Sequence, residues 1–165
     1  MQDKFFKDVE VALERIRHII RQTPLQFSPS LSEESGAEVF LKLENFQVTG
    51  SFKARGAINN ILSSDEKDLK NGITAVSAGN HAIAASYAAN IFNLNNKIFL
   101  YESANKYRVQ VCKNYRANIS FTNAEKAFDE VKTAEKQGYK FVHPFDGVHT
   151  LQGSATLGLE IINQI

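Results

Sequence analysis

Apolar residues near the beginning of the chain recur at the spacing of an amphipathic helix. Within residues 3–21 they form one stripe, which comprises Phe5, Val9, Ala12, Leu13, Ile16, Ile19 and Ile20. The spacing predicts a helix that ends before Thr23-Pro24. Residues 28–36 combine an early proline, a Ser-x-x-Glu pattern and Gly36, which indicates a helical turn with a capping box and a glycine end.

Residues 38–44 alternate between apolar and polar side chains, which is typical of a strand. Val39, Leu41 and Leu43 share one face of this predicted strand. The opposite face carries two glutamates and Lys42. We therefore expect a half-buried strand whose charged residues point to solvent.

From residue 50 onward, short β-rich runs alternate with helical windows. The pattern predicts helices over residues 51–62, 80–92, 104–115 and 123–137, and strands over 73–77, 97–101, 118–121 and 140–143. The helix over 123–137 has a capping box of its own, from Thr122 to Glu125, and stops at Gly138. A final helical window covers 151–165. This alternation predicts an α/β fold, with right-handed crossovers, a parallel sheet and helices on both faces.

The composition is that of a soluble globular protein, with 165 residues, 43% hydrophobic and 22% charged. A net charge of +1 gives no field that would attract nucleic acid or anionic lipid, so we expect neither partner. The single Cys112 cannot form an internal disulfide, and the charged first residues lack the apolar region of a signal peptide. We expect a cytoplasmic protein without a membrane span.

Lys53 lies in the first turn of the predicted helix over 51–62, directly after Phe52. The helix dipole and the neighbouring Arg55 disfavour a cation there, so we expect a lowered pKa and a nucleophilic amine. A lysine that forms Schiff bases needs this state. The alternative is an ordinary solvated lysine.

A second candidate segment directly follows the apolar strand over 73–77. It consists of Ser77, Ala78, Gly79, Asn80 and His81. Ligands of parallel sheets bind beyond the carboxyl ends of the strands, where helix N-termini offer free N–H groups to anions. The segment is therefore a candidate carboxylate site, although a plain strand-to-helix turn with an asparagine cap is an equal alternative.

The remaining candidates are weaker. His143 and His149 are far apart and lack further ligands, so no metal site is expected. Cys112 has no histidine or aspartate partner in sequence, which favours a buried thiol. A modest basic cluster favours a solvated helix face; it comprises Lys106, Arg108, Lys113 and Arg116.

Taken together, the segments resemble the pyridoxal-phosphate enzymes of the threonine/serine dehydratase family, which have the tryptophan-synthase β-like fold. The resemblance extends over nearly the whole chain. It is carried by Thr23-Pro24-Leu25, Glu38-Val39-Phe40-Leu41-Lys42-Leu43-Glu44-Asn45, Ser51-Phe52-Lys53-Ala54-Arg55-Gly56-Ala57, Ser77-Ala78-Gly79-Asn80-His81-Ala82, His143-Pro144-Phe145-Asp146 and Gly158-Leu159-Glu160-Ile161.

The resemblance implies a role for each matching residue. Lys53 would be the catalytic lysine bonded to pyridoxal 5'-phosphate, Phe52 would pack on the cofactor ring, and Asn80 would hydrogen-bond the ring hydroxyl. Residues 77–81 would bind the carboxylate of an amino-acid substrate. The implied reaction is β-elimination from threonine or serine, giving a 2-keto acid and ammonia. Ala78 carries no acid or base, which argues against a racemase.

The resemblance also implies a division of the chain. Residues 1–50 would be the first elements of a larger domain, 51–148 the small α/β domain, and 149–165 a helix returning toward the larger domain. Family members are about twice as long, and their second half supplies a glycine-rich loop for the cofactor phosphate. The nine glycines here include no adjacent pair. We therefore expect a truncated protein with weak cofactor binding and little activity alone.

Other classes remain open at this stage. The chain could be a noncatalytic remnant, a regulatory fragment or one half of a split enzyme. A flavodoxin-like response regulator is a distant alternative, because Lys53 and Asn80 stand where it would need carboxylates. The unpartnered apolar faces of the terminal segments predict a homo-oligomer or association with a missing C-terminal half.

Overall fold

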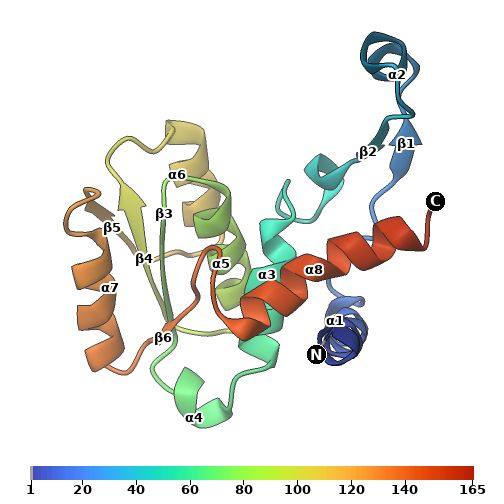
Figure 1. The fold of residues 1–165 in the computed structure, drawn as a ribbon. Coiled ribbons are helices and arrows are strands. Elements are labelled where there is room, and N and C mark those ends of the chain that lie inside the picture. Colours follow the sequence, from blue (N-terminus) through green and yellow to red (C-terminus); the bar gives the residue numbers. More distant parts are fainter. Residues whose placement is uncertain (1) are drawn as a thin grey trace.

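A four-stranded parallel sheet lies at the centre of the computed structural model, which describes residues 2–165 (Figure 1). Its order is β5-β4-β3-β6, formed by β3 (Ile73–Ser77), β4 (Asn96–Tyr101), β5 (Ile119–Thr122) and β6 (Lys140–Phe141). Ile73 is in register with Asn96 on one side and with Lys140 on the other. Because all three pairings are parallel, the strands end at one common edge.

Helices cover both faces of the sheet, as the sequence predicted (Figure 1). On one face, Ala75 and Ile98 belong to the large apolar core with α5 (Asn80–Ile91), which α6 (Lys106–Asn114) covers from outside. On the other face, Val76 and Phe99 pack against Val131 of α7 (Ala127–Lys136). Alternate strand residues thus face opposite helical layers, so both faces of the two central strands β3 and β4 carry buried apolar side chains.

Three further helices pack beside this layered unit: α1 (Gln2–Ile16), α3 (Lys53–Leu62) and α8 (Val148–Ile162). Helix α3 lies between the others, because it contacts α5 on one side and both α1 and α8 on the other. Its contact with α8 is close: a Cβ built at Gly153 would lie 2.5 Å from the carbonyl oxygen of Arg55. Helix α3 therefore carries Lys53 on a firmly packed element.

A slender extension projects from the body in Figure 1. It consists of β1 (Leu25–Phe27), which pairs antiparallel with β2 (Phe40–Lys42), and of α2 (Pro29–Ser35) at the tip. Gly36 ends α2 in the left-handed conformation, with φ 69°, as predicted. A short 3-10 helix, η1 (Glu44–Phe46), leads back to the body. Strand β1 and the one-turn α4 (Glu66–Leu69) were not predicted from the sequence.

The predicted strand over 38–44 is wrong in both length and orientation. Only residues 40–42 form a strand, and Leu41 remains 39% exposed. The side chain of Lys42, expected in solvent, is only 6% exposed. The reason is tertiary, because a carboxylate from α8 gives the lysine a buried partner, whereas Leu41 on the apolar face stays exposed.

Three predicted helix ends also differ. Helix α1 ends at Ile16, where the chain turns so that Ile20 still reaches the core. The two capping boxes do not form: Ser28 makes no side-chain cap bond, and α7 begins only at Ala127. Before α7, the Asn123 side chain accepts a hydrogen bond from the Lys126 amide. This bond forms a turn in place of the predicted cap.

Among the described residues 2–165, no helix is long and apolar enough to cross a membrane. The division into segments 1–50, 51–148 and 149–165 stays a prediction.

Candidate active site

A cavity of about 390 Å³ opens where the carboxyl end of β3 approaches the first turn of α3. Five of the predicted site residues line it: Lys53, Ser77, Ala78, Asn80 and His81. The chain thus brings together two segments that are more than twenty residues apart in sequence. Their meeting follows from the topology, because α3 packs on α5 and α5 starts directly after β3.

Lys53 is half-buried at one wall of the cavity. Its Nζ donates a hydrogen bond to the carbonyl oxygen of Pro144 at 2.5 Å and lies 4.9 Å from the centre of the Phe52 ring. Burial lowers the pKa of this amine below its ordinary value. The amine therefore loses its proton more readily than a solvated lysine, as a carbonyl-binding lysine requires.

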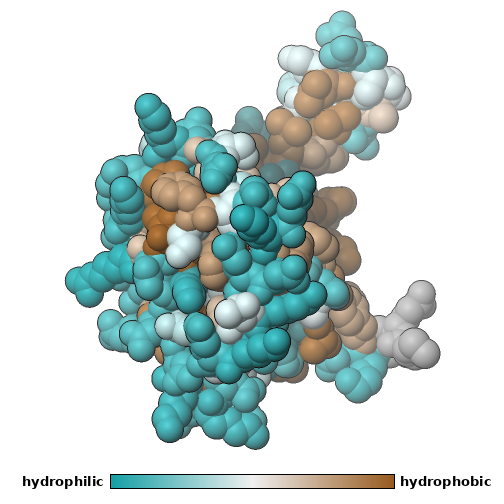
Figure 2. Space-filling view, turned by 90° about the vertical axis from the view of Figure 1, so that its left-hand side faces the viewer, coloured by the Kyte–Doolittle hydropathy of each residue, from teal (hydrophilic) through white to brown (hydrophobic). Residues whose placement is uncertain are grey.

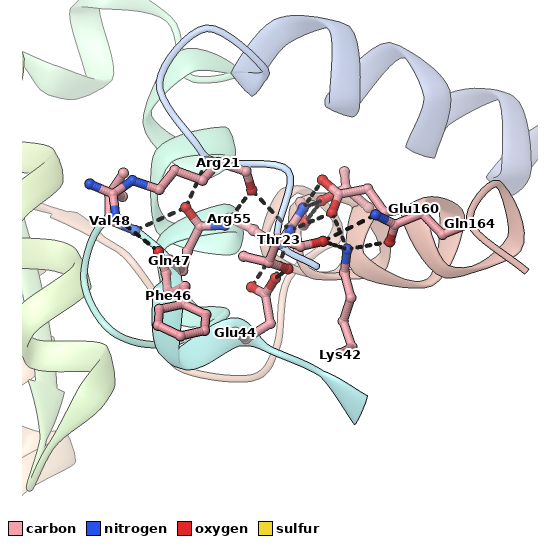
Figure 3. A network of polar contacts seen from close by, with 12 residues as sticks. Arg21, Thr23, Lys42, Glu44, Phe46, Gln47, Val48, Arg55, Glu160 and Gln164 are labelled. Carbon is pink, nitrogen blue, oxygen red and sulfur yellow. Dashed lines mark hydrogen bonds and ion pairs between the residues drawn. The ribbon is translucent and has the colours of Figure 1, made fainter. Parts of the chain in front are cut away.

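Two causes were predicted for that lowered pKa, the helix dipole and the charge of Arg55, and the second is wrong. Arg55 is completely buried and faces away into a polar network (Figure 3). It bonds Glu44 through Nε at 2.9 Å and Nη2 at 2.7 Å, and Glu160 through Nη1 at 2.7 Å. Two carboxylates neutralise the guanidinium, so desolvation of Lys53 itself lowers its pKa.

The network around Arg55 fixes α3 against the rest of the chain. Burial alone would lower the pKa of the guanidinium, but the bonds with Glu44 and Glu160 raise it. Lys42 Nζ adds a 2.6 Å bond to the Glu160 carboxylate and a 2.7 Å bond to the Thr23 carbonyl oxygen (Figure 3). Removal of one partner from such a network costs about 3–5 kcal/mol, because the others are left buried and unpaired.

The loop of residues 77–81 forms the opposite wall of the cavity. The Gly79 amide donates to the Ser77 hydroxyl at 3.0 Å, which fixes the turn, and Asn80 is exposed at the start of α5. Helix N-termini attract anions through their free N–H groups and dipole. The arrangement suits a carboxylate, and the assignment of this loop as the substrate site stays a prediction.

The His81 side chain has a structural position, not a ligand position. Its ring is 3% exposed, and Nε2 lies 2.7 Å from the carbonyl oxygen of Val142. Desolvation lowers the pKa of the ring to about 4, so the ring is neutral at pH 7 and Nε2–H is the donor. The side chain thereby joins the first turn of α5 to the segment after β6.

Four residues that the sequence did not assign to the site also line the cavity. Tyr101 ends β4, Phe128 lies on α7, Phe145 follows Pro144, and Arg108 comes from α6. Phe145 had been named only as part of a segment that carries the resemblance, and Arg108 only as part of a solvated basic helix face. The two phenylalanine rings lie beside His143, whose ring centre is 4.6 Å from that of Phe145 and 6.1 Å from that of Phe128. Their positions depend on four different elements, so no local pattern could have indicated them. Within residues 2–165, no cluster of three or more potential metal ligands is found.

A primary amine of lowered pKa, at the carboxyl edge of a parallel sheet and opposite a helix N-terminus, defines the class of enzymes that bind a carbonyl cofactor. A family model described as pyridoxal-phosphate dependent enzyme matches residues 16–165. The chain belongs to this family, and the resemblance to threonine/serine dehydratases is confirmed.

Individual relatives support the same assignment. The chain is 38% identical to L-threonine ammonia-lyase of Thermotoga maritima, over 96% of this chain and 40% of that protein. It is 40% identical to phenylserine dehydratase of Ralstonia pickettii, over 91% of this chain and 47% of that protein. The structure of maize serine racemase superposes with a TM-score of 0.91 at 30% identity, over 96% of this chain and 49% of that one. The chain thus spans about half the length of these proteins or less.

The residues of the cavity fit pyridoxal phosphate at its aldehyde end. Lys53 supplies the amine, and Ser77 and Asn80 offer neutral polar groups in the same cavity. The turn before Lys53 lies outside the lining of this cavity, and it holds two buried hydroxyls, of Thr49 and Ser51, that have no hydrogen-bond partner within the described chain. Buried polar atoms without partners are rare in native proteins and indicate a missing ligand or water.

Proposed function

We propose that this chain carries the lysine and the substrate-carboxylate site of a pyridoxal-phosphate-dependent dehydratase. The reaction would be the β-elimination of water from threonine or serine, which yields a 2-keto acid and ammonia. The observation that carries the proposal is the single cavity lined by both Lys53 and the loop of residues 77–81. The dehydratases among the relatives support the reaction class.

Each site residue has a defined task in this proposal. Pyridoxal phosphate, when bound, withdraws electrons from the α-carbon of an amino acid and so acidifies its proton. Lys53 Nζ is the covalent attachment point and the base that accepts this proton. Phe52 would pack on the cofactor ring, Asn80 would hydrogen-bond its hydroxyl, and the amides of residues 77–81 would hold the substrate carboxylate.

A racemase is the second candidate, since serine racemases are among the similar structures. Racemisation needs a second proton carrier on the opposite ring face. Ala78 follows Ser77 in the loop and has no acid or base. This residue favours elimination over racemisation.

Trapping of the cofactor on the lysine tests the proposal. We expect pyridoxal phosphate followed by borohydride to label Lys53 first, because its amine is the one with the lowered pKa, and peptide mass mapping would identify the site. Lys53→Ala should lose the label, whereas Lys113→Ala, at an exposed position on α6, should keep it. Label spread evenly over the surface lysines would refute the assignment.

Binding by the 165-residue chain alone should be weak. Charge-assisted hydrogen bonds to a phosphate contribute about 1.5–3 kcal/mol each, and loss of two of them weakens affinity by about a hundredfold or more. We therefore expect no ammonia release from threonine or serine above that of free pyridoxal phosphate. Restored activity on addition of a polypeptide with the second half would support a split enzyme, and continued inactivity a noncatalytic remnant.

The assembly is also part of the proposal. We expect a cytoplasmic protein that forms a homo-oligomer or pairs with a C-terminal half, with a small amino acid as its substrate. Exposed apolar side chains on the extension support association, and the Discussion gives its test.

A further inference from the structure

The guanidinium of Arg108 covers the central glycine of the loop over residues 77–81. A Cβ built on Gly79 would lie 2.6 Å from Nη1, 3.0 Å from Cζ and 3.4 Å from Nε of this arginine. Three guanidinium atoms at such distances show that the group lies directly against the glycine backbone. Only the missing side chain of Gly79 makes room for it.

The charge around this guanidinium is unbalanced. The residues that line the cavity include two cations, Lys53 and Arg108, and no aspartate or glutamate. The ring of His81 adds no charge at pH 7, because its pKa is about 4. Within residues 2–165, the guanidinium of Arg108 makes no hydrogen bond or ion pair, whereas that of Arg55 is bonded to two carboxylates.

We infer that Arg108 is a carboxylate-binding residue of the active-site cavity, which acts together with the amides of residues 77–81. The inference rests on the proposed function, in which this loop holds the carboxylate of the substrate. A guanidinium offers two parallel N–H donors that match the two oxygens of a carboxylate, so it adds charge and orientation to the neutral amides. The partner group is the α-carboxylate or, in an acidic amino acid, a second carboxylate.

The loop itself contributes to the position of Arg108. A Cβ at this position would meet the guanidinium, so an alanine would displace it. Gly79→Ala thus moves the charge without removing it.

Carboxylate titrations of the purified chain, without any cofactor, test the inference. Backbone and arginine Nε–H signals are followed by nuclear magnetic resonance while acetate or malonate is added at constant ionic strength. In the unmodified chain we expect saturable shifts at residues 77–81 and at Arg108. Arg108→Gln should weaken binding about tenfold, which corresponds to about 1.4 kcal/mol. The affinity of Arg108→Lys should lie between those of Arg108→Gln and the unmodified chain.

Matched variants show whether the effect is local. Arg116→Gln removes an exposed cation beyond the other end of α6, and its dissociation constant should equal that of the unmodified chain. Gly79→Ala should weaken binding, and adding it to Arg108→Gln should weaken binding no further, because both remove one contact.

The two acids distinguish the sources of the carboxylate. If Arg108→Gln weakens the binding of both acetate and malonate, Arg108 is assigned to the α-carboxylate. If it weakens the binding of malonate alone, Arg108 is assigned to a second carboxylate. Equal dissociation constants for Arg108→Gln and the unmodified chain would overturn the inference. So would the lack of any saturable resonance shift at residues 77–81 and Arg108. The titration involves neither Lys53 nor pyridoxal phosphate, so its result is independent of the labelling experiment.

Discussion

At the scale of single residues, the role of a buried charged group depends on whether it has a partner of opposite charge. Lys53 and Arg55 are two positions apart in the first turn of α3, yet they differ in burial, in their partners and in the direction of their pKa shift. Arg55 is fully buried between Glu44 and Glu160, so its pKa is raised and it acts as a structural tie. Lys53 has only a carbonyl oxygen as its partner, so burial lowers its pKa and leaves a reactive amine.

His81 leads to a prediction about the pH dependence of stability. The folded pKa of its ring is about 4, against an ordinary value of 6.5, so the unfolded chain binds the proton more tightly. The stabilisation from a neutral His81 is therefore complete above pH 6.5 and is lost as the pH falls toward 4. Between pH 7.5 and 4.5 we expect a loss of about 2 to 3 kcal/mol from this group.

Urea unfolding of variants measures this contribution. His81→Gln cannot titrate, so the difference in unfolding free energy between it and the unmodified chain should shrink as the pH falls. His18→Gln, at an exposed position next to α1, should keep the slope of the unmodified chain. A constant difference between the unmodified chain and His81→Gln over this pH range would contradict the assignment.

At the scale of elements, the crossing of α3 and α8 positions the reactive lysine. Gly153 lies against Gly56 and Asn59 of α3, and the polar network joins Arg55 to Glu160 of α8 at the same interface. Small residues let the helix backbones approach, and the ion pairs then fix their register. The position of Lys53 therefore depends on contacts between α3 and α8, which lie outside the cavity.

Gly153→Ala tests this crossing. The new methyl group would lie 2.5 Å from the Arg55 carbonyl oxygen and 2.6 Å from Asn59 Cβ, so the helices must separate. We expect a destabilisation of about 1–3 kcal/mol, measured by chemical unfolding.

Gly158→Ala is the control for the Gly153 variant, because it lies in the same helix with nothing within 4 Å of its Cβ position. This variant should be stabilised by up to about 1 kcal/mol, since alanine is the better helix former. Equal stabilities for the two variants would show that the crossing tolerates a larger separation.

For the whole molecule, the main feature is an apolar surface on the projecting extension (Figure 2). Its exposed side chains are Phe27, Leu31, Phe40 and Leu41, each between 39% and 43% exposed. The centres of the Phe27 and Phe40 rings lie 5.4 Å apart, and both side chains remain 43% exposed within the described residues 2–165. Monomeric proteins rarely leave such a contiguous patch in water.

We predict that the chain associates through this extension. Light scattering at micromolar concentration should give a mass above the 18.4 kDa of one chain. The double variant Phe40→Ser and Leu41→Ser should shift the mass toward the monomer. Tyr107→Ser, which replaces an isolated aromatic on α6 that is 74% exposed, should leave it unchanged. A monomeric mass for the unmodified chain, without binding of an apolar dye, would refute the prediction.

Local patterns in the sequence were enough to predict the elements of the central sheet and to single out the candidate site residues. The strand over residues 73–77 was predicted with the bounds that the structure has. This success has a local cause, because a buried parallel strand is an uninterrupted apolar run and its helices show their own period. The lysine and the loop of residues 77–81 were also found from short segments, since each is read from a few adjacent residues.

Only the tertiary structure decided which charges are buried and which side chains share a cavity. Lys42 and Glu44 were placed on a solvent face by alternation, but Glu160 of α8 is a buried partner of Lys42 and Arg55 of α3 is a buried partner of Glu44. Arg108 was predicted to be one cation on a solvated helix, and packing of α6 beside α5 places its guanidinium on Gly79. The free energy of a charged group depends on everything that surrounds it in space, and neighbours in sequence are only a small part of that environment.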